Sequence, residues 1–244
     1  MSKIRLAVLI CFALLACVPA FAVDGQILIN QATVTAAGGF PYKITQPGSY
    51  KLSGNLSVSG STDGILICAT DVTLDLNGFV INGNGSQGFG ISNDSTMGCG
   101  AALNVTVKNG VVRGFYDGVI LGGSGLISDL QSSNNSRFGI WAAGGVSAGF
   151  VVTRCVALSN TGAGIKADYA VVNNSISNSS SIGFDVTYAT AIGNLAVSNG
   201  TGMAPDHSVI GSNTLEDNSL DLRPVGPSSR YVSQGNNICG AGAC

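Results

Sequence analysis

The sequence predicts an all-β protein of one domain, wound as a parallel β-helix whose successive coils stack into a solenoid. Glycine followed by a bulky apolar residue recurs seven times, and each pair comes a few residues after a polar segment that contains Asn. The apolar members lie 19 to 28 residues apart. A repeat this short must stack on its neighbours to bury its apolar side. The pairs are Gly64-Ile65, Gly90-Ile91, Gly118-Val119, Gly139-Ile140, Gly164-Ile165, Gly183-Phe184 and Gly202-Met203.

Composition supports strands over helices. Charged residues make up 10% of the chain, and its 35 glycines accompany many Ser, Asn, Thr, Val and Ile residues. Residues of these types favour short strands joined by tight turns. Residues 71–78 and 104–112 alternate apolar and polar side chains, as half-buried strands do. Strands that recur once per coil pair with their equivalents in the next coil, so we expect parallel ladders.

The last coils keep a constant spacing of 19 residues. This spacing predicts that equivalent residues lie on neighbouring rungs, about 4.8 Å apart. An Asn also marks a turn in each of several coils, where it tolerates the left-handed backbone and where stacked amides can hydrogen-bond from coil to coil. The expected columns are Tyr169, Tyr188 and His207; Asp168, Thr187 and Asp206; Lys166, Asp185 and Ala204; and Asn135, Asn160, Asn178, Asn199 and Asn218.

The N-terminus has the pattern of an export signal. Lys3 and Arg5 precede an apolar run at residues 6–15, and small residues follow at 20 and 22. We expect cleavage after Ala22, with lipidation at Cys17 as the minority alternative because residues 14–17 resemble a lipobox. The apolar run is too short for an ordinary membrane span. The expected organisation is a signal peptide at 1–22, an N-terminal cap at 23–60, coils at 61–220 and a C-terminal cap at 221–244.

Charge and cysteine content narrow the partners. The formal net charge of −2 argues against a nucleic-acid surface, which needs clustered Lys and Arg. No Cys/His spacing typical of a metal site occurs, so no cofactor is expected, and Ca²⁺ has no motif to support it. In an oxidising compartment we expect Cys239 to pair with Cys244 across a flexible spacer, and Cys68 with Cys99 across neighbouring coils. Cys155 lies in an apolar strand and reads as a buried thiol.

Several segments resemble bacterial secreted right-handed parallel β-helix proteins of the pectate-lyase-like superfamily. They are Pro47-Gly48-Ser49-Tyr50, residues 72–78 and Asn109-Gly110, followed by the later Asn and Gly-apolar coils. The resemblance covers roughly residues 40–240 and implies a right-handed coil. It does not select an activity, because the superfamily includes lyases, hydrolases, epimerases and adhesins. The Asp motifs of its polygalacturonase-like hydrolases are missing here, and the only adjacent acidic pair is Glu216-Asp217.

The best candidate for a binding surface is one outer face of the later coils. Alternation along the strand directs Trp141 outward, where an aromatic ring can stack on a sugar, and Lys166 and Asp168 can contact hydroxyls or acidic sugars. The competing interpretation is that Trp141 packs under a loop while the Tyr and His rings form a stabilising stack. The candidate residues are Trp141, Lys166, Asp168, Asp185, Asp206 and His207.

Other charged residues have simpler interpretations. Arg113 and Asp117 flank one loop and are expected to form a local ion pair, with a lyase-like base at Arg113 as the minor alternative. Asp75 is expected to satisfy turn amides, and a metal role for Asp71 and Asp75 is the minor alternative. Arg137 and Arg154 are expected to be solvated or to neutralise nearby Asp residues.

These observations favour an exported protein, periplasmic, extracellular or on the cell surface, without a catalytic site. We expect it to bind an extracellular polysaccharide or cell-surface component, or to serve a structural role. Scarce charge argues against catalysis, since proton transfer needs positioned ionisable groups. One alternative is a polysaccharide lyase or glycoside hydrolase acting on an acidic polysaccharide. Another is an adhesin-like module that binds proteins. No catalytic or metal-binding residue is predicted.

Overall fold

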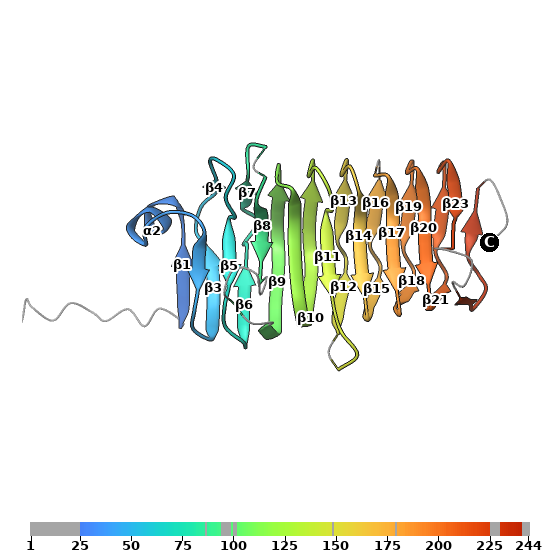
Figure 1. Cartoon of the computed structure of the whole chain (residues 1–244), viewed down its shortest axis with the longest axis horizontal. Coiled ribbons are helices and arrows are strands. Elements are labelled where there is room, and N and C mark those ends of the chain that lie inside the picture. Colours follow the sequence, from blue (N-terminus) through green and yellow to red (C-terminus); the bar gives the residue numbers. More distant parts are fainter. Residues whose placement is uncertain are drawn as a thin grey trace, which may run out of the picture.

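A computed structural model describes residues 25–85, 87–93, 99, 102–147, 149–178, 180–224 and 230–240. The expected signal peptide, Cys17 and Cys244 lie outside these ranges. Parallel strands stack into a solenoid of about nine turns, which runs from β1 at one end to the last strands at the other (Figure 1). Every strand pairing in the described residues is parallel and joins equivalent strands of successive coils. The predicted all-β class and right-handed parallel β-helix are confirmed.

Each coil contributes three strand segments, which form three columns along the axis. The first column is sheet B, whose outer face carries the predicted site. Its strands are β2 (Tyr42–Ile44), β5 (Ile65–Ile67), β8 (Phe89–Ser92), the start of β10 (Asp117–Ser133), β11 (Ile140–Ala143), β14 (Ala163–Asp168), β17 (Ile182–Thr187), β20 (Thr201–Asp206) and β23 (Leu220–Leu222).

The other two columns belong to sheet A, and the long strands β9 (Ala102–Arg113) and β10 pass through both. The second column contains β1 (Gln26–Ile29), β3 (Gly48–Leu52), β6 (Val72–Asp75), β12 (Phe150–Thr153), β15 (Ala170–Asn173), β18 (Thr190–Ile192), β21 (Ser208–Gly211) and β24 (Tyr231–Ser233). The third contains β4 (Leu56–Ser57), β7 (Val80–Asn82), β13 (Val156–Leu158), β16 (Ile176–Asn178), β19 (Leu195–Val197), β22 (Thr214–Glu216) and β25 (Ile238–Cys239).

Parallel pairing begins at β1, inside the expected N-terminal cap, and reaches β25, inside the expected C-terminal cap. The division of the chain into caps and coils stays a prediction. A short helix, α2 (Gln31–Ala36), follows β1 near the N-terminal end of the stack. The side chain of Asn30 caps it by accepting hydrogen bonds from the backbone N–H groups of Ala32 and Thr33.

The apolar members of the Gly-apolar pairs form one continuous buried column inside sheet B. They pair with one another rung by rung, and each is completely buried. The column is Ile65, Ile91, Val119, Ile140, Ile165, Phe184 and Met203. Such burial of large apolar side chains is the main favourable term in folding. The repeat seen in the sequence is therefore the core of the solenoid.

The glycine of each pair lies where the coils approach most closely. A Cβ added at Gly139 would lie 2.5 Å from the carbonyl oxygen of Gly164, and one at Gly183 would lie 2.4 Å from that of Gly202. The same hypothetical Cβ at Gly183 would also lie 3.0 Å from the side-chain nitrogen of Asn199. Glycine is therefore required because the backbone of the next coil and a buried amide occupy the space of a side chain.

Buried Asn side chains fill this space and connect the coils. The amide of Asn135 donates to the side-chain oxygen of Asn160 at 2.9 Å, and that of Asn199 donates to Asn218 at 3.1 Å. Asn178 does not join the expected ladder. It is the last residue of β16 and its side chain lies on the outer side of the strand, whereas the buried Ser180 takes the inner position. The Ser180 hydroxyl is the one buried side-chain polar atom among the described residues without a hydrogen-bond partner.

A second amide ladder runs along another corner of the coil. Asn194 donates to Asn213 at 3.1 Å, and Asn213 donates to Asn237 at 3.1 Å. In the coil before Asn194, Ser175 takes this position, and in the coil before that, Cys155 takes it. The backbone N–H of Cys155 donates to the Ser175 hydroxyl at 3.2 Å. Cys155 is completely buried and free, as predicted. Burial raises the pKa of its thiol to about 11.

Candidate functional site

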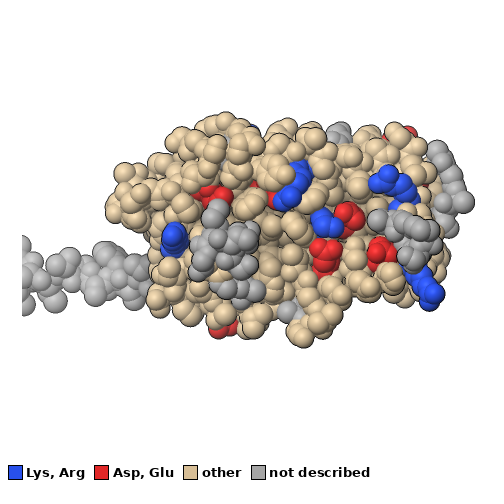
Figure 2. Space-filling view, viewed as in Figure 1, with Lys and Arg blue, Asp and Glu red and all other residues tan. Residues whose placement is uncertain are grey.

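The outer face of sheet B brings four of the six predicted residues together. Trp141 on β11 pairs in register with Lys166 on β14, which pairs with Asp185 on β17. Asp168 lies two residues after Lys166 and therefore points to the same side of β14. In the space-filling view, basic and acidic side chains gather near the middle of this face (Figure 2). The 19-residue spacing thus predicted the neighbours Lys166 and Asp185 correctly.

Lys166 is held between two carboxylates. Its ammonium group donates to Asp185 at 3.1 Å and lies 3.6 Å from Asp168. The three side chains are each about one-fifth exposed, at 20%, 22% and 20% for Lys166, Asp168 and Asp185. The indole N–H of Trp141 donates to the other oxygen of Asp168 at 2.8 Å. These bonds fix the orientation of the indole and leave it half-buried.

A row of aromatic rings extends this cluster toward earlier coils. The rings of Phe138 and Trp141 meet edge to face with centroids 5.5 Å apart, and those of Phe89 and Tyr116 lie 6.5 Å apart. All four rings are partly exposed. We call Phe89, Tyr116, Phe138 and Trp141 the aromatic row. Only Trp141 was singled out from the sequence, because the others lie in coils of unequal length.

Arg137 contacts three of the four rings of the aromatic row. Its guanidinium carbon lies 4.5 Å from the ring centroid of Tyr116, 4.6 Å from that of Phe138 and 5.5 Å from that of Trp141. Such cation–π contacts stabilise both the cation and the ring positions. The guanidinium also donates to both carboxylate oxygens of the buried Asp117, and this hydrogen bond raises the pKa of Arg137.

The expected ion pair between Arg113 and Asp117 is therefore wrong. Asp117 is completely buried and receives Arg137 from the next coil, together with the backbone N–H of Phe138 at 3.0 Å. Arg113 ends β9 and is exposed. The expectation that Arg137 and Arg154 neutralise Asp residues is confirmed. Arg154 donates to Asp129 at 2.7 Å, and this hydrogen bond lowers the pKa of Asp129.

Asp206 and His207 lie at a corner, apart from the Lys166 cluster. Tyr169, Tyr188 and His207 occupy equivalent corner positions, with left-handed φ values of 51°, 50° and 47°. Their rings stack along the axis with centroids 4.9 and 4.8 Å apart. His207 contacts the Asp206 carboxylate at 2.8 Å. Because the rings cover one another, most of their faces are unavailable to a ligand, which favours a structural role.

Asp71 and Asp75 form hydrogen bonds within and between coils. Asp75 accepts from the backbone N–H of Asn77 at 2.7 Å, in agreement with its expected turn role, and Asp71 accepts from the Asn104 amide at 2.9 Å. Within the described ranges, no group of three or more His, Cys, Asp or Glu side chains is arranged to hold a metal ion. No helix in these same ranges is both long and apolar enough to cross a bilayer.

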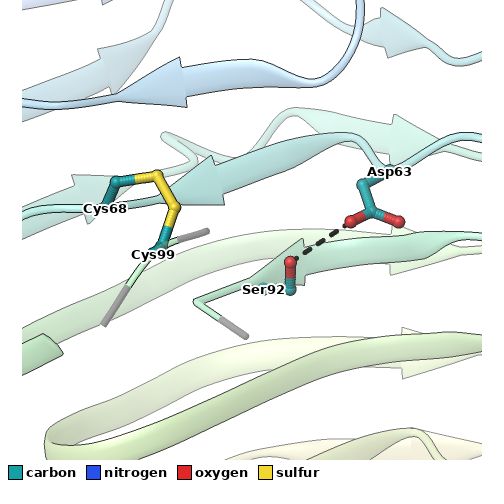
Figure 3. Close-up of a disulfide and its surroundings, with 4 residues drawn as sticks. All are labelled: Asp63, Cys68, Ser92 and Cys99. Atoms are coloured by element: carbon teal, nitrogen blue, oxygen red, sulfur yellow. Dashed lines mark hydrogen bonds between the residues drawn. A yellow bond between two sulfur atoms is a disulfide. The ribbon is translucent and has the colours of Figure 1, made fainter. Parts of the chain in front are cut away.

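The predicted disulfide between Cys68 and Cys99 is present, with Cα atoms 4.7 Å apart. It links neighbouring coils at the end of β5, and the buried Asp63, whose carboxylate accepts from the Ser92 hydroxyl at 3.4 Å, lies near the other end of that strand (Figure 3). Cys239 is also disulfide-bonded. Its expected partner Cys244 lies outside the described residues, so that pairing stays a prediction. Disulfides are typical of proteins in oxidising compartments, which is consistent with export.

Comparison with known proteins gives little beyond this description. No protein-family model matches the chain, and no curated protein matches it. Among solved structures, the chain is similar to the A-module of the mannuronan C-5 epimerase AlgE4 of Azotobacter vinelandii. The TM-score is 0.43 at 13% identity, over 78% of this chain and 75% of the epimerase module. A likeness this distant carries no argument about activity, so function rests on the geometry of sheet B.

Proposed function

We propose that the protein is an exported polysaccharide-binding β-helix without a catalytic site, and that it binds through the outer face of sheet B. The observation that carries the proposal is the aromatic row beside the Lys166 cluster. Partly exposed rings from successive coils give a ligand several apolar contacts, and the neighbouring Lys and Asp side chains offer hydrogen bonds to hydroxyl groups. Sugars present this combination of an apolar ring face and a polar rim.

The rigidity of the face supports binding. Trp141 is fixed by its bond to Asp168, and Arg137 holds the rings of Tyr116 and Phe138. Side chains that are ordered before binding lose little entropy when a ligand arrives. The row crosses several coils, with Phe89 and Trp141 on strands of sheet B and Tyr116 and Phe138 just before β10 and β11. A surface of this kind suits an extended polymer, which makes many weak contacts, better than a small metabolite.

The ion pairs formed by the charged side chains support a binding role without catalysis. Each cation near the aromatic row is already engaged by carboxylates: Arg137 by Asp117, and Lys166 by Asp168 and Asp185. A general acid or base must exchange its proton with the substrate, which these ion pairs oppose. The chemistry of the face therefore favours recognition of hydroxyl groups over proton transfer.

The proposal is tested with a panel of immobilised neutral and acidic polysaccharides. We expect Tyr116→Ala and Trp141→Ala each to weaken retention on the bound polymer by about tenfold, the effect of losing one aromatic contact of about 1.4 kcal/mol. Tyr188→Ala is the matched control, because it removes an exposed ring from the corner stack and should leave retention unchanged. Unchanged retention by a folded Trp141→Ala protein would contradict the site.

The alternatives give different results in the same experiments. Release of unsaturated sugar products, followed by their ultraviolet absorbance with and without added Ca²⁺, would indicate a polysaccharide lyase. Binding to cell-surface proteins but to no polysaccharide would indicate an adhesin-like module. Export has its own test: the mass of the mature protein should correspond to cleavage after Ala22. A diacylglyceryl group on Cys17 would instead indicate membrane anchoring by lipid.

A further inference from the structure

The third strand column presents an outer face without charge at its centre. The outward side chains of β13, β16 and β19 include five aliphatic residues and one amide, and all are partly exposed. We call them the aliphatic face. Sheet B, in contrast, carries the Lys166 and Arg137 clusters. Exposed aliphatic side chains that adjoin one another commonly mark an interaction surface. The residues are Val156, Leu158, Ile176, Asn178, Leu195 and Val197.

Opposite charges bound this face at its two ends. Arg113, Ser133, Leu158, Asn178, Val197 and Glu216 occupy one column, because each pairs in register with the next. Arg113 and Glu216 are therefore five rungs apart, about 24 Å along the axis. Both are exposed, and neither forms an ion pair with any residue that the structure describes. Glu216 is also the sole Glu of the chain.

We propose that a second copy of this chain packs on the aliphatic face, with the two solenoid axes antiparallel. A two-fold axis lying in the interface along the strands reverses the order of the rungs and keeps each column opposite itself. It sets Arg113 against the partner's Glu216 at one end, and Glu216 against the partner's Arg113 at the other. Leu158 and Asn178 lie nearest the axis. After this half-turn, the charge at each end of the column therefore faces the opposite charge of the partner.

The regular rungs also favour a second copy over an unrelated partner. Side chains of two sheets interdigitate when their strand spacings match, as in sheet-on-sheet packing. Another copy supplies the same spacing of about 4.8 Å over the same number of rungs. Five rungs by about 10 Å of strand, the length of three residues, give roughly 240 Å² from each copy. This is less than the roughly 800 Å² per partner of stable complexes, so we expect a reversible dimer.

Charge reversal tests the arrangement. In sedimentation velocity of the mature chain at low salt, we expect a monomer–dimer equilibrium that shifts with protein concentration. Arg113→Glu and Glu216→Arg should each weaken association by about tenfold or more, because each places like charges opposite one another at both ends. An equimolar mixture of the two variants should dimerise again, since opposite charges then meet at both ends of the heterodimer. The double variant should also dimerise.

Two further variants separate this interface from general charge effects. Lys43→Glu makes the same charge change as Arg113→Glu at an exposed position on β2, and it should leave association unchanged. Leu195→Lys should abolish the dimer while the protein keeps its circular-dichroism spectrum, because a charge then lies in the aliphatic centre. A chain that is monomeric at every concentration, or a variant mixture that associates no better than its components, would overturn the proposal.

Discussion

Asn194 donates a side-chain N–H to the side-chain oxygen of Asn213 in the next coil, over 3.1 Å, and both residues are buried. The same oxygen accepts the backbone N–H of Asn194 at 3.0 Å, while the Asn213 amide donates to the carbonyl of Ala191 at 2.9 Å. One side chain thus satisfies polar groups of two coils. This arrangement links the local turn to the stability of the stack.

Removal of one ladder amide should destabilise the protein strongly. We expect Asn213→Ala to lower the free energy of unfolding by about 2–3 kcal/mol, because it leaves several buried polar groups without partners. Urea unfolding followed by circular dichroism measures the change. Asn173→Ala is the control: Asn173 lies on the outer side of β15, and its side chain makes a single weak contact of 3.5 Å with Asn174. Equal losses in both variants would contradict a special role for the ladder.

The glycine column predicts a steric effect. Gly183→Ala should lower the free energy of unfolding by about 1–3 kcal/mol, since the added methyl group must displace the backbone of Gly202 or the amide of Asn199. Thermal melting compares this variant with Gly145→Ala. A Cβ at Gly145 meets no atom within 4 Å, so we expect that control to melt as the natural sequence does.

Ser180 offers the opposite test, a gain of stability. The side-chain amides of Asn160 and Asn199 lie beside Gly139 and Gly183, whereas the side chain nearest Gly164 is the Ser177 hydroxyl, and no amide of the described residues is among the atoms nearest to it. We expect Ser180→Asn to raise the free energy of unfolding by about 0.5–1.5 kcal/mol, because its amide would complete the hydrogen bonds from Asn160 to the next coil. Ser180→Ala, which removes only the unpartnered hydroxyl, should be neutral. A Ser180→Asn protein less stable than the natural sequence would disprove the missing-rung interpretation.

Cys155 should be chemically inert in the folded protein. With its pKa raised to about 11 by burial, the thiol is almost fully protonated at neutral pH and also shielded from reagents. We expect alkylation by iodoacetamide only at the rate of unfolding. Ser147→Cys, at an exposed loop position, is the positive control and should react at once. Rapid labelling of Cys155 under native conditions would contradict its buried position.

The same thiol predicts a dependence of stability on alkaline pH. Its pKa of about 11 in the folded state exceeds the ordinary value of 9.0, so the unfolded chain releases the proton first as pH rises. Stability should therefore fall as the pH rises from about 9 to about 11, and ionisation of the thiol should not change stability below pH 9. Cys155→Ala should remove this loss of stability. Urea midpoints of both proteins at pH 8 and pH 10 make the comparison.

The fold was predictable because its main signal is a repeat. Every apolar member of the Gly-apolar pairs reached the same buried column, although the coils differ in length. The register of the three columns that begin at Lys166, Asp168 and Tyr169 was also predictable, since a constant spacing of 19 residues fixes which residues are neighbours. The partner of the glycine column was not apparent, because the amide that fills the space beside Gly183 comes from a separate turn.

The site was predictable only in part, because only some of its residues lie in coils of equal length. Lys166 and Asp185 follow the constant spacing, whereas Arg137 reaches Asp117 and Tyr116 across coils of unequal length. Proximity along the chain suggested Arg113 for Asp117, but parallel stacking makes the next coil nearer than the preceding loop. Asn178 was misassigned because the inner position depends on where the strand ends, and Ser180 occupies it.

The equal length of the last coils has a consequence for how such a molecule can change size. Ala163, Ile182 and Thr201 begin successive strands of one column, and each pairs with the next. Excision of residues 182–200 would join Ser181 directly to Thr201 and bring equivalent corners together. The molecule would shorten by one layer, about 4.8 Å, with its remaining contacts intact. Duplication of the same segment would lengthen it equally, so natural selection can adjust the reach of this protein one layer at a time.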